Sequence, residues 1–181
     1  LPLGECQGEG RVARRTRHAL TLALSQKARG HSRAGLASLD YVLILAGDHL
    51  YRMDYSEMAE FHWETGADIT VAVQPVHESE AHRLGILKRD KDRRISEFAE
   101  KPSDPVILKQ MVSRADAKKP YFVSMGIYLF NTETLIELLR ETAFDDFGTH
   151  VIPASIHTHK VYGYDFEGYW EDIGTIRRFY E

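Results

Sequence analysis

The amino-acid sequence predicts an α/β fold with a mixed, mostly parallel β-sheet, flanking helices and one β-hairpin. Short apolar runs rich in β-branched residues are typical of buried strands, and one of them is followed by a stretch of helical spacing. A later segment alternates on both sides of a charged turn, as hairpins do. The 181 residues are enough for one domain with a sizeable core.

The first ordered segment is a strand, a helix and a second strand. Residues 41–46, YVLILA, are an apolar run that predicts a strand buried on both faces. Apolar residues recur at helical spacing over 55–65, and Gly66 stands at the position where helices often end. A strand over 68–76 completes a unit that calls for a parallel pair and a right-handed crossover.

The rest of the chain continues with strands and helices. Residues 84–102 are predicted to form the hairpin, with its turn at 90–93. A strand over 122–130 leads into a helix over 132–140. The remaining segments are a loop with a short helix, a strand with an acidic loop, and the start of a final helix (145–157, 159–175 and 176–181).

The charge changes sign near the start of the first strand. Residues 1–39 contain seven Lys or Arg and two acidic residues, whereas the whole chain has a net charge of −4. We expect residues 1–38 to be a basic, poorly ordered leader, whose best candidate for order is a helix around 12–27. This leader has no aromatic residues for stacking on bases, so we expect no nucleic-acid partner.

Composition argues against several other classes of protein. Cys6 is the single cysteine, which excludes an intrachain disulfide and a cysteine-rich metal site. No run approaches the roughly 18 apolar residues of a membrane span, and no secretory signal is visible. We therefore expect no membrane partner and a cytoplasmic location.

Two carboxylates are candidates for a metal site. Asp48 follows the strand 41–46, and ligands of open α/β sheets bind beyond the carboxyl ends of the strands. Such a carboxylate suits Mg²⁺ bridging nucleotide phosphates. Asp172, in YWEDIGT, could share that ion. The alternatives are that Asp48 is the N-cap of the following helix and that Asp172 caps a later one.

Three further polar residues stand at strand positions. Glu100 and Lys101 are neighbours in EFAEKP, and strand neighbours point to opposite faces, so an ion pair between them is not expected. Lys101 suits a phosphate, and the alternative is a solvated edge pair. Ser124 precedes Gly126, and a glycine inside a strand often marks close approach of backbone or ligand. Ser124 is either a partner for a sugar hydroxyl or a core serine bonded to backbone.

Other kinds of catalysis find no support in the sequence. The nine histidines fall in different elements, none of them in an H-E-x-x-H arrangement, and we expect no histidine metal set. His157 and His159 are interpreted as surface residues. No G-x-S-x-G elbow and no P-loop is present, so we expect neither a nucleophilic serine nor P-loop chemistry.

Five segments together resemble a known family. LAGDHLYRMDY, EFAEKP, SMGIYLF, DDFGTHVIP and YWEDIGT, in this order, are similar to bacterial glucose-1-phosphate adenylyltransferase, the ADP-glucose pyrophosphorylase, over residues 39–181. The resemblance implies a Rossmann-like nucleotide-diphospho-sugar transferase fold. It also implies the glycogen-biosynthesis reaction of ATP with glucose 1-phosphate to give ADP-glucose and diphosphate, with Mg²⁺ as the cofactor.

The resemblance also implies roles for single residues. Asp48 and Asp172 match the family's metal-binding, catalytic carboxylates. Four residues match its glucose 1-phosphate contacts: Gly85, Glu100, Lys101 and Ser124. Lys101 would neutralise the sugar phosphate, and no protein nucleophile is required.

The sequence also departs from the family pattern. The family's Gly-rich G-G-x-G-x-R-L loop and its W-Y-x-G-T-A-D-A segment have no counterpart in residues 1–38. The sequence also shows no counterpart of the family's C-terminal β-helix domain, which supports homotetramer contacts in the family. We expect residues 39–181 to be the sugar-phosphate half of the catalytic domain, with little activity alone. The alternatives are a related sugar-1-phosphate nucleotidyltransferase using UTP, GTP or dTTP, and a non-catalytic piece that binds sugar phosphate or pairs with a full-length subunit.

Overall fold

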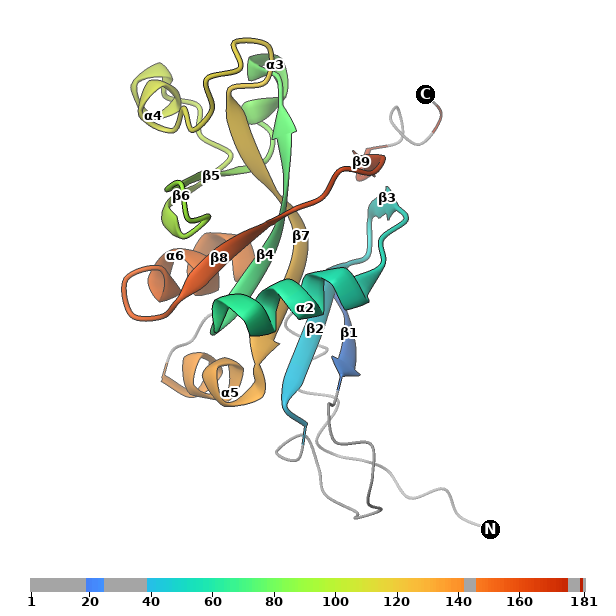
Figure 1. Cartoon of the computed structure of the whole chain (residues 1–181). Coiled ribbons are helices and arrows are strands. Elements are labelled where there is room, and N and C mark those ends of the chain that lie inside the picture. The colour runs from blue at the N-terminus through green and yellow to red at the C-terminus, as the bar shows by residue number, and fades with distance from the viewer. Residues whose placement is uncertain (1–18, 25–38, 142–145, 176–179, 181) are drawn as a thin grey trace.

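A mixed β-sheet forms the centre of the molecule (Figure 1). The computed structural model describes residues 19–24, 39–141, 146–175 and 180. The main sheet has the order β1-β2-β7-β4-β8, and β5 pairs with both β6 and β7. Its strands are β1 (Ala19–Leu24), β2 (Tyr41–Ala46), β4 (Ile69–Val76), β5 (Gly85–Arg89), β6 (Ile95–Glu100), β7 (Tyr121–Asn131) and β8 (Val161–Asp165).

Short strands and helices surround this sheet. A second sheet consists of β3 (His49–Tyr51) and β9 (Trp170–Asp172). The helical elements are α2 (Tyr55–Thr65), α3 (Glu78–Ala81), α4 (Pro105–Gln110), α5 (Thr132–Glu141), the π-helical η2 (Phe147–Val151) and α6 (Ile152–Ser155). The predicted α/β class, with a mixed sheet, flanking helices and a hairpin, is confirmed. Among the described helices, none combines the length and apolar character needed to cross a bilayer.

The strand β7 determines how the sheet is assembled. It lies between β2 and β4 and runs antiparallel to both. The pair expected between the strands at 41–46 and 69–76 therefore does not form, although these strands point in the same direction. Among the described ladders of the main sheet, that of β4 with β8 is parallel and the others are antiparallel, so the sheet is mixed as predicted but its ladders are not mostly parallel. With 11 residues, nearly all buried, β7 has partners along both edges and suits the middle of the sheet.

The two faces of the sheet carry separate cores. Successive residues of β2 point to opposite faces, so Leu43 belongs to the core that contains Met58 of α2, and Ile44 to the core that contains Ile152 of α6. Figure 1 shows α2 lying across one face of the sheet. Phe130 of β7 is fully buried in the second core. Packing on both faces holds in place the strands whose ends carry the predicted site residues.

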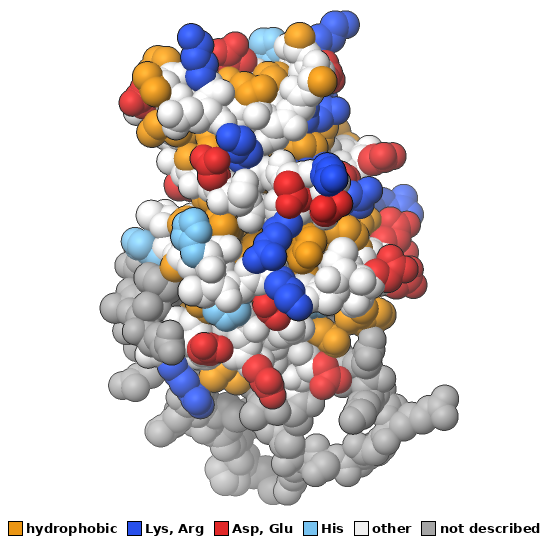
Figure 2. Space-filling model, turned by 60° about the vertical axis from the view of Figure 1, so that its left-hand side comes forward, with side chains coloured by type: hydrophobic (Ala, Val, Ile, Leu, Met, Phe, Trp, Pro, Cys, Tyr) orange, Lys and Arg blue, Asp and Glu red, His pale blue; other side chains and the backbone are white. Residues whose placement is uncertain are grey.

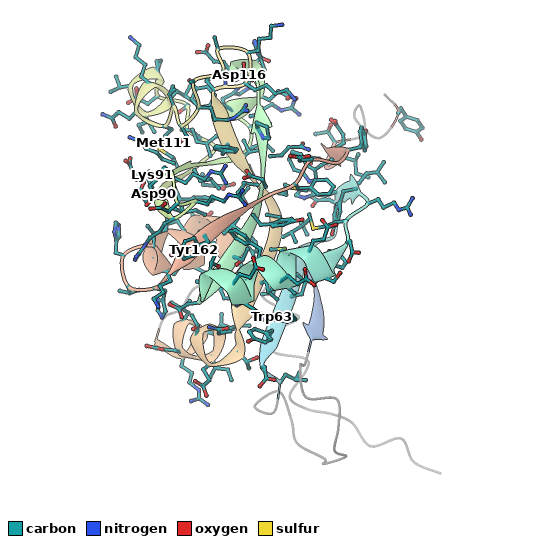
Figure 3. The ribbon with its side chains drawn as sticks, viewed as in Figure 1. Trp63, Asp90, Lys91, Met111, Asp116 and Tyr162 are labelled. Atoms are coloured by element: carbon teal, nitrogen blue, oxygen red, sulfur yellow. The ribbon has the colours of Figure 1, made fainter. Side chains whose placement is uncertain are left out.

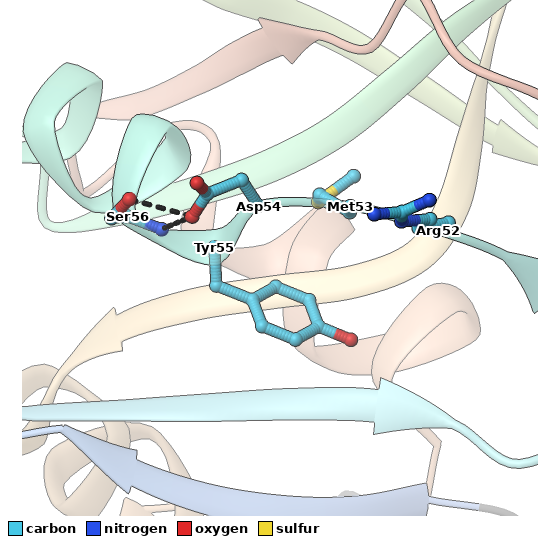
Figure 4. Close-up of a pocket in the computed structure, with 5 residues that line it drawn as sticks. All are labelled: Arg52, Met53, Asp54, Tyr55 and Ser56. Carbon is cyan, nitrogen blue, oxygen red and sulfur yellow. Dashed lines mark hydrogen bonds between the residues drawn. The ribbon is translucent and has the colours of Figure 1, made fainter.

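Helix α2 has the predicted bounds because both of its ends are fixed locally. Asp54 is the N-cap, and its carboxylate accepts hydrogen bonds from the hydroxyl of Ser56 at 2.6 Å and its backbone N–H at 2.9 Å (Figure 4). These bonds lower the pKa of Asp54. Gly66 ends the helix with φ 59°. The alternative that Asp48 caps this helix is therefore wrong.

The predicted hairpin is confirmed and its charged turn is exposed. Asp90 holds the turn, because its carboxylate accepts from the backbone N–H groups of Asp92 and Arg94, both at 2.9 Å. Figure 3 shows Asp90 and Lys91 at the tip of the hairpin. Acidic and basic side chains are interspersed on this side of the molecule (Figure 2). The turn therefore has the properties of a solvated surface.

The leader contains a strand in place of the expected helix. Ala19–Leu24 forms β1 and pairs antiparallel with β2, with Ala19 opposite Ala46. The helix prediction around 12–27 is wrong for these residues, since the sheet offers β2 as a partner for an apolar segment. The domain boundary at residue 39 stays a prediction. The helix expected over 176–181 falls almost wholly outside the described residues.

Buried His62 gives the fold a pH dependence. Its Nδ1 lies 2.8 Å from the Thr70 hydroxyl and its Nε2 3.1 Å from the Asn131 side-chain oxygen. Burial lowers the pKa of His62, although the bond to Asn131 acts against this. The unfolded chain therefore takes up a proton at a higher pH than the folded chain, and stability is lost as the pH falls below the ordinary value of about 6.5.

We expect His62→Gln to reduce this loss of stability. Between about pH 7.5 and about pH 5.5, the unfolding free energy of the wild-type chain should fall more than that of the variant. Urea unfolding at both pH values measures the difference. His82→Gln, at an exposed position, is the control and should keep the wild-type pH dependence. Equal pH dependence in all three proteins contradicts the assignment.

Candidate active site

The strands β3 and β9 bring Asp48 and Asp172 together. Asp48 lies in the turn between β2 and β3, and His49 pairs with Asp172 in the antiparallel ladder of β3 with β9. The backbone N–H of Ile173 donates to the carbonyl of Asp48 at 3.0 Å, which fixes the turn to the second strand. One ligand atom each from Asp48, His49 and Asp172 lies within 4.8 Å of the others. The two carboxylates predicted from the sequence are therefore neighbours.

A glycine leaves room beside both carboxylates. A Cβ atom on Gly174 would lie 3.0 Å from Asp172 Oδ1 and 3.2 Å from Asp48 Oδ2. The N–H of Gly174 donates to Asp172 Oδ1 at 2.9 Å. This is the kind of bond that a helix-capping Asp makes, which was the alternative role of Asp172. The side chain of Asp48 is 44% exposed. Two accessible carboxylates with space beside them fit a divalent cation.

His49 is the member of this group that the sequence did not predict. Its Nδ1 lies 2.6 Å from the carbonyl oxygen of Met125, and its Nε2 lies 3.6 Å from Asp48 Oδ1. The ring packs edge-on against Trp170, with 5.3 Å between ring centroids. The only available signal was that His49 directly follows Asp48, and nothing in the sequence pairs it with Asp172.

The backbone at Gly126 lies close to Ala46 and His49, as a glycine inside a strand often indicates. It has φ 66°, and a Cβ atom there would lie 2.9 Å from both Ala46 Cβ and His49 Cε1. Its N–H donates to Ser124 Oγ at 3.2 Å. Gly126 thus connects the residues around Asp48 to Ser124.

We expect Gly126→Ala to destabilise the fold more than Gly66→Ala does. Both glycines have φ close to 60°, but a Cβ atom on Gly66 would meet nothing within 4 Å. The strain of the left-handed conformation costs about 1–2 kcal/mol at either position, and only Gly126→Ala adds steric clashes. Urea unfolding of the two variants measures the difference. Equal destabilisation would mean that Ala46 and His49 move aside at little cost, and would contradict the prediction.

A second group of residues surrounds the end of the hairpin. Gly85 pairs with Glu100 in the ladder of β5 with β6, and a Cβ atom on Gly85 would lie 2.7 Å from Glu100 Oε2. Lys101 Nζ lies 3.5 Å from Glu100 Oε1, so the expectation that these neighbours do not pair is wrong. The reason is that Lys101 follows the end of β6 with φ 43°, and the alternation of a strand no longer applies there.

The Glu100 carboxyl group lies in a partly enclosed site. Burial raises its pKa, the neighbouring Lys101 lowers it, and the negative charge of Asp146 raises it again. A Cβ atom on Gly148 would lie 3.0 Å from Glu100 Oε2. Gly85 and Gly148 therefore hold the carboxylate between two backbone segments that are far apart in the sequence.

Ser124 is tied into the strand that carries it. Its hydroxyl donates to the Tyr128 hydroxyl at 3.2 Å and accepts from the backbone of Gly126. Burial raises the pKa of Tyr128 to about 12, and the charges of Glu100 and Asp146 act in the same direction. Ser124 thus makes the backbone bond of a core serine, and its partner Tyr128 is near enough to Glu100 for that charge to affect its pKa. The sequence did not single out Tyr128 or Asp146.

Two hollows lie away from these residues. One has a volume of about 490 Å³ and is lined by residues 52–56 of the loop before α2 (Figure 4). The other, of about 600 Å³, is lined by basic side chains around Phe122, and its Arg89 is paired with Asp165 at 2.7 Å. Neither of these two hollows is lined by a predicted site residue.

Residues 7–181 match the family model described as nucleotidyl transferase. The match spans almost the whole chain and begins within residues 1–38, the expected leader.

Proposed function

The chain belongs to the nucleotidyl transferase family, and we propose that it transfers the adenylyl group of ATP to glucose 1-phosphate, giving ADP-glucose and diphosphate. Membership makes it a nucleotidyltransferase. The further details of the proposal follow from the resemblance of the five motifs: ATP and glucose 1-phosphate as substrates, Mg²⁺ as cofactor, a role in glycogen biosynthesis and a homotetramer. The proposed cytoplasmic location follows from the sequence, which shows no membrane span or secretory signal.

One observation carries the proposal. Strand pairing gathers residues of these motifs into two groups, because β3 with β9 brings Asp48 to Asp172, and β5 with β6 places Gly85 opposite Glu100. Gly126 lies against His49 of the first group, and its N–H donates to Ser124 Oγ. A carboxylate pair suits a cation and a lysine suits a phosphate, and the proposed reaction needs both.

The chemistry needs no covalent intermediate on the protein. An oxygen of the sugar phosphate bonds to the α-phosphorus of ATP while the bond from that phosphorus to the diphosphate breaks. Lys101 would bind the sugar phosphate as a point charge. Asp48 and Asp172 would hold Mg²⁺, which neutralises charge on the transferring group. The Glu100 carboxylate keeps Lys101 directed to one side of the hairpin.

Isotope exchange tests the proposal. The chain is incubated with Mg²⁺, radiolabelled diphosphate and one nucleotide sugar, and labelled nucleoside triphosphate is collected. Little activity is expected of this chain alone, so the readout is the nucleotide specificity of slow exchange. Label in ATP from ADP-glucose, however slow, supports the proposal, whereas label only from UDP-, GDP- or dTDP-glucose assigns a related transferase. Titration calorimetry with glucose 1-phosphate accompanies the assay. Binding without exchange favours the non-catalytic alternative, and the absence of both contradicts the proposed substrate.

A further inference from the structure

The geometry points to His49 as a third ligand of the divalent cation at Asp48 and Asp172, acting through its Nε2 atom. This inference rests on the proposed metal-binding role of the two carboxylates. It goes beyond that role because the resemblance assigns the cation to carboxylates alone. Three contacts of the His49 ring carry the argument.

The first contact determines which ring nitrogen carries hydrogen. His49 Nδ1 lies 2.6 Å from the carbonyl oxygen of Met125, and a carbonyl oxygen can only accept. Nδ1 therefore donates, and in the neutral ring Nε2 has the free electron pair. Histidines that bind metals almost always donate their other ring N–H to a carbonyl, a carboxylate or water in this way.

The second contact shows where the free electron pair lies. His49 Nε2 is 3.6 Å from Asp48 Oδ1, and His49 faces Asp172 across the ladder of β3 with β9. The ligand atoms of the three residues lie within 4.8 Å of one another. Ligands about 2.1 Å from a shared cation lie at most about 4.2 Å apart, so small side-chain movements bring all three into reach.

The third contact holds the ring in this orientation. The His49 side chain is only 12% exposed. Trp170 packs edge-on against it, and Gly126 approaches it so closely that even a methyl group would clash. A ring enclosed in this way is preorganised for binding.

A nitrogen ligand changes which cation the site prefers. Carboxylates and water suit Mg²⁺, whereas an imidazole adds a donor that Mn²⁺ and Co²⁺ accept more readily. We therefore expect Mn²⁺ to bind the wild-type chain more tightly than Mg²⁺, and replacement of His49 to narrow this difference.

Pulsed electron paramagnetic resonance of bound Mn²⁺ tests the inference without any assay of turnover. The wild-type chain should show modulation from a directly coordinated ¹⁴N nucleus, and labelling of histidine with ¹⁵N should replace it with the ¹⁵N pattern. His49→Gln should abolish the nitrogen signal and weaken Mn²⁺ binding by about 10-fold or more. His82→Gln, at an exposed position, is the control and should change neither.

The wild-type spectrum is enough to overturn the inference, so the test stays decisive even if the variant does not fold. Bound Mn²⁺ without nitrogen coupling overturns the inference, even if His49→Gln weakens binding by loosening Asp48. Failure of the proposed metal role is a different outcome. In that case Mn²⁺ does not bind, or it binds equally well after Asp48→Asn.

Discussion

Asp48→Asn is expected to weaken Mn²⁺ and Mg²⁺ binding by about 30-fold to several-thousand-fold. The loss of one charged contact costs roughly 2–5 kcal/mol, and each 1.4 kcal/mol is about tenfold in affinity. The variant keeps the size and most of the hydrogen-bonding capacity of the side chain, so the backbone turn to Ile173 should persist. The change therefore tests the charge of Asp48 and leaves its shape unchanged.

Titration calorimetry and circular dichroism measure cation affinity and folding. The control is Asp54→Asn, because Asp54 is exposed in the same region and asparagine caps helices about as well as aspartate. Cation affinity should stay at the wild-type value in this control. In an active form of the enzyme, Asp48→Asn should mainly lower kcat, since the cation stabilises charge that develops as the phosphoryl bond changes. Wild-type affinity in the folded Asp48→Asn variant contradicts the assignment.

Local signals made parts of the fold predictable. The bounds of α2 follow from Asp54 at its start and Gly66 at its end, and both act within a few residues of the helix. The hairpin was predictable for the same reason, because Asp90 bonds only to the turn that contains it. Neither prediction required knowledge of a distant partner.

Pairing between distant segments could not be derived in this way. The apolar runs of β2, β4 and β7 are equally typical of buried strands, and nothing in them states that β7 lies between the others. The strands β3 and β9 have only three residues each, so a segment expected as an acidic loop became a strand through its partner. His49 remained unnoticed because its position beside Asp172 depends on that same pairing.

The prediction that Glu100 and Lys101 do not pair failed because of the backbone conformation of Lys101. The alternation of side chains is a property of extended backbone, and Lys101 leaves it with φ 43°. A positive φ is uncommon for lysine, and nothing in the sequence EKP predicts it. The resulting contact with Glu100 places both charges on the same side of the hairpin.

Lys101→Ala is expected to weaken binding of glucose 1-phosphate by about 10- to 100-fold, since a hydrogen bond to a charged group contributes about 1.5–3 kcal/mol. The substitution removes a positive charge and leaves the Glu100 carboxylate, which repels phosphate, without its partner. Alanine keeps the Cβ atom, so the backbone strain at φ 43° should stay the same. The Lys101 side chain is 66% exposed, and the effect should therefore decrease as salt concentration rises.

Lys88→Ala is the matched control for this prediction. Lys88 lies on the same hairpin and pairs with Glu97 at 3.3 Å, so the variant loses the same kind of ion pair at a site without a role in the proposal. Calorimetric titration with glucose 1-phosphate should show weak binding only for Lys101→Ala. In turnover assays the loss should appear mainly in KM, because the phosphate contact is present in both the ground state and the transition state. Equal affinities of the two variants would mean that Lys101 is a surface lysine held by Glu100, and that the sugar phosphate binds elsewhere.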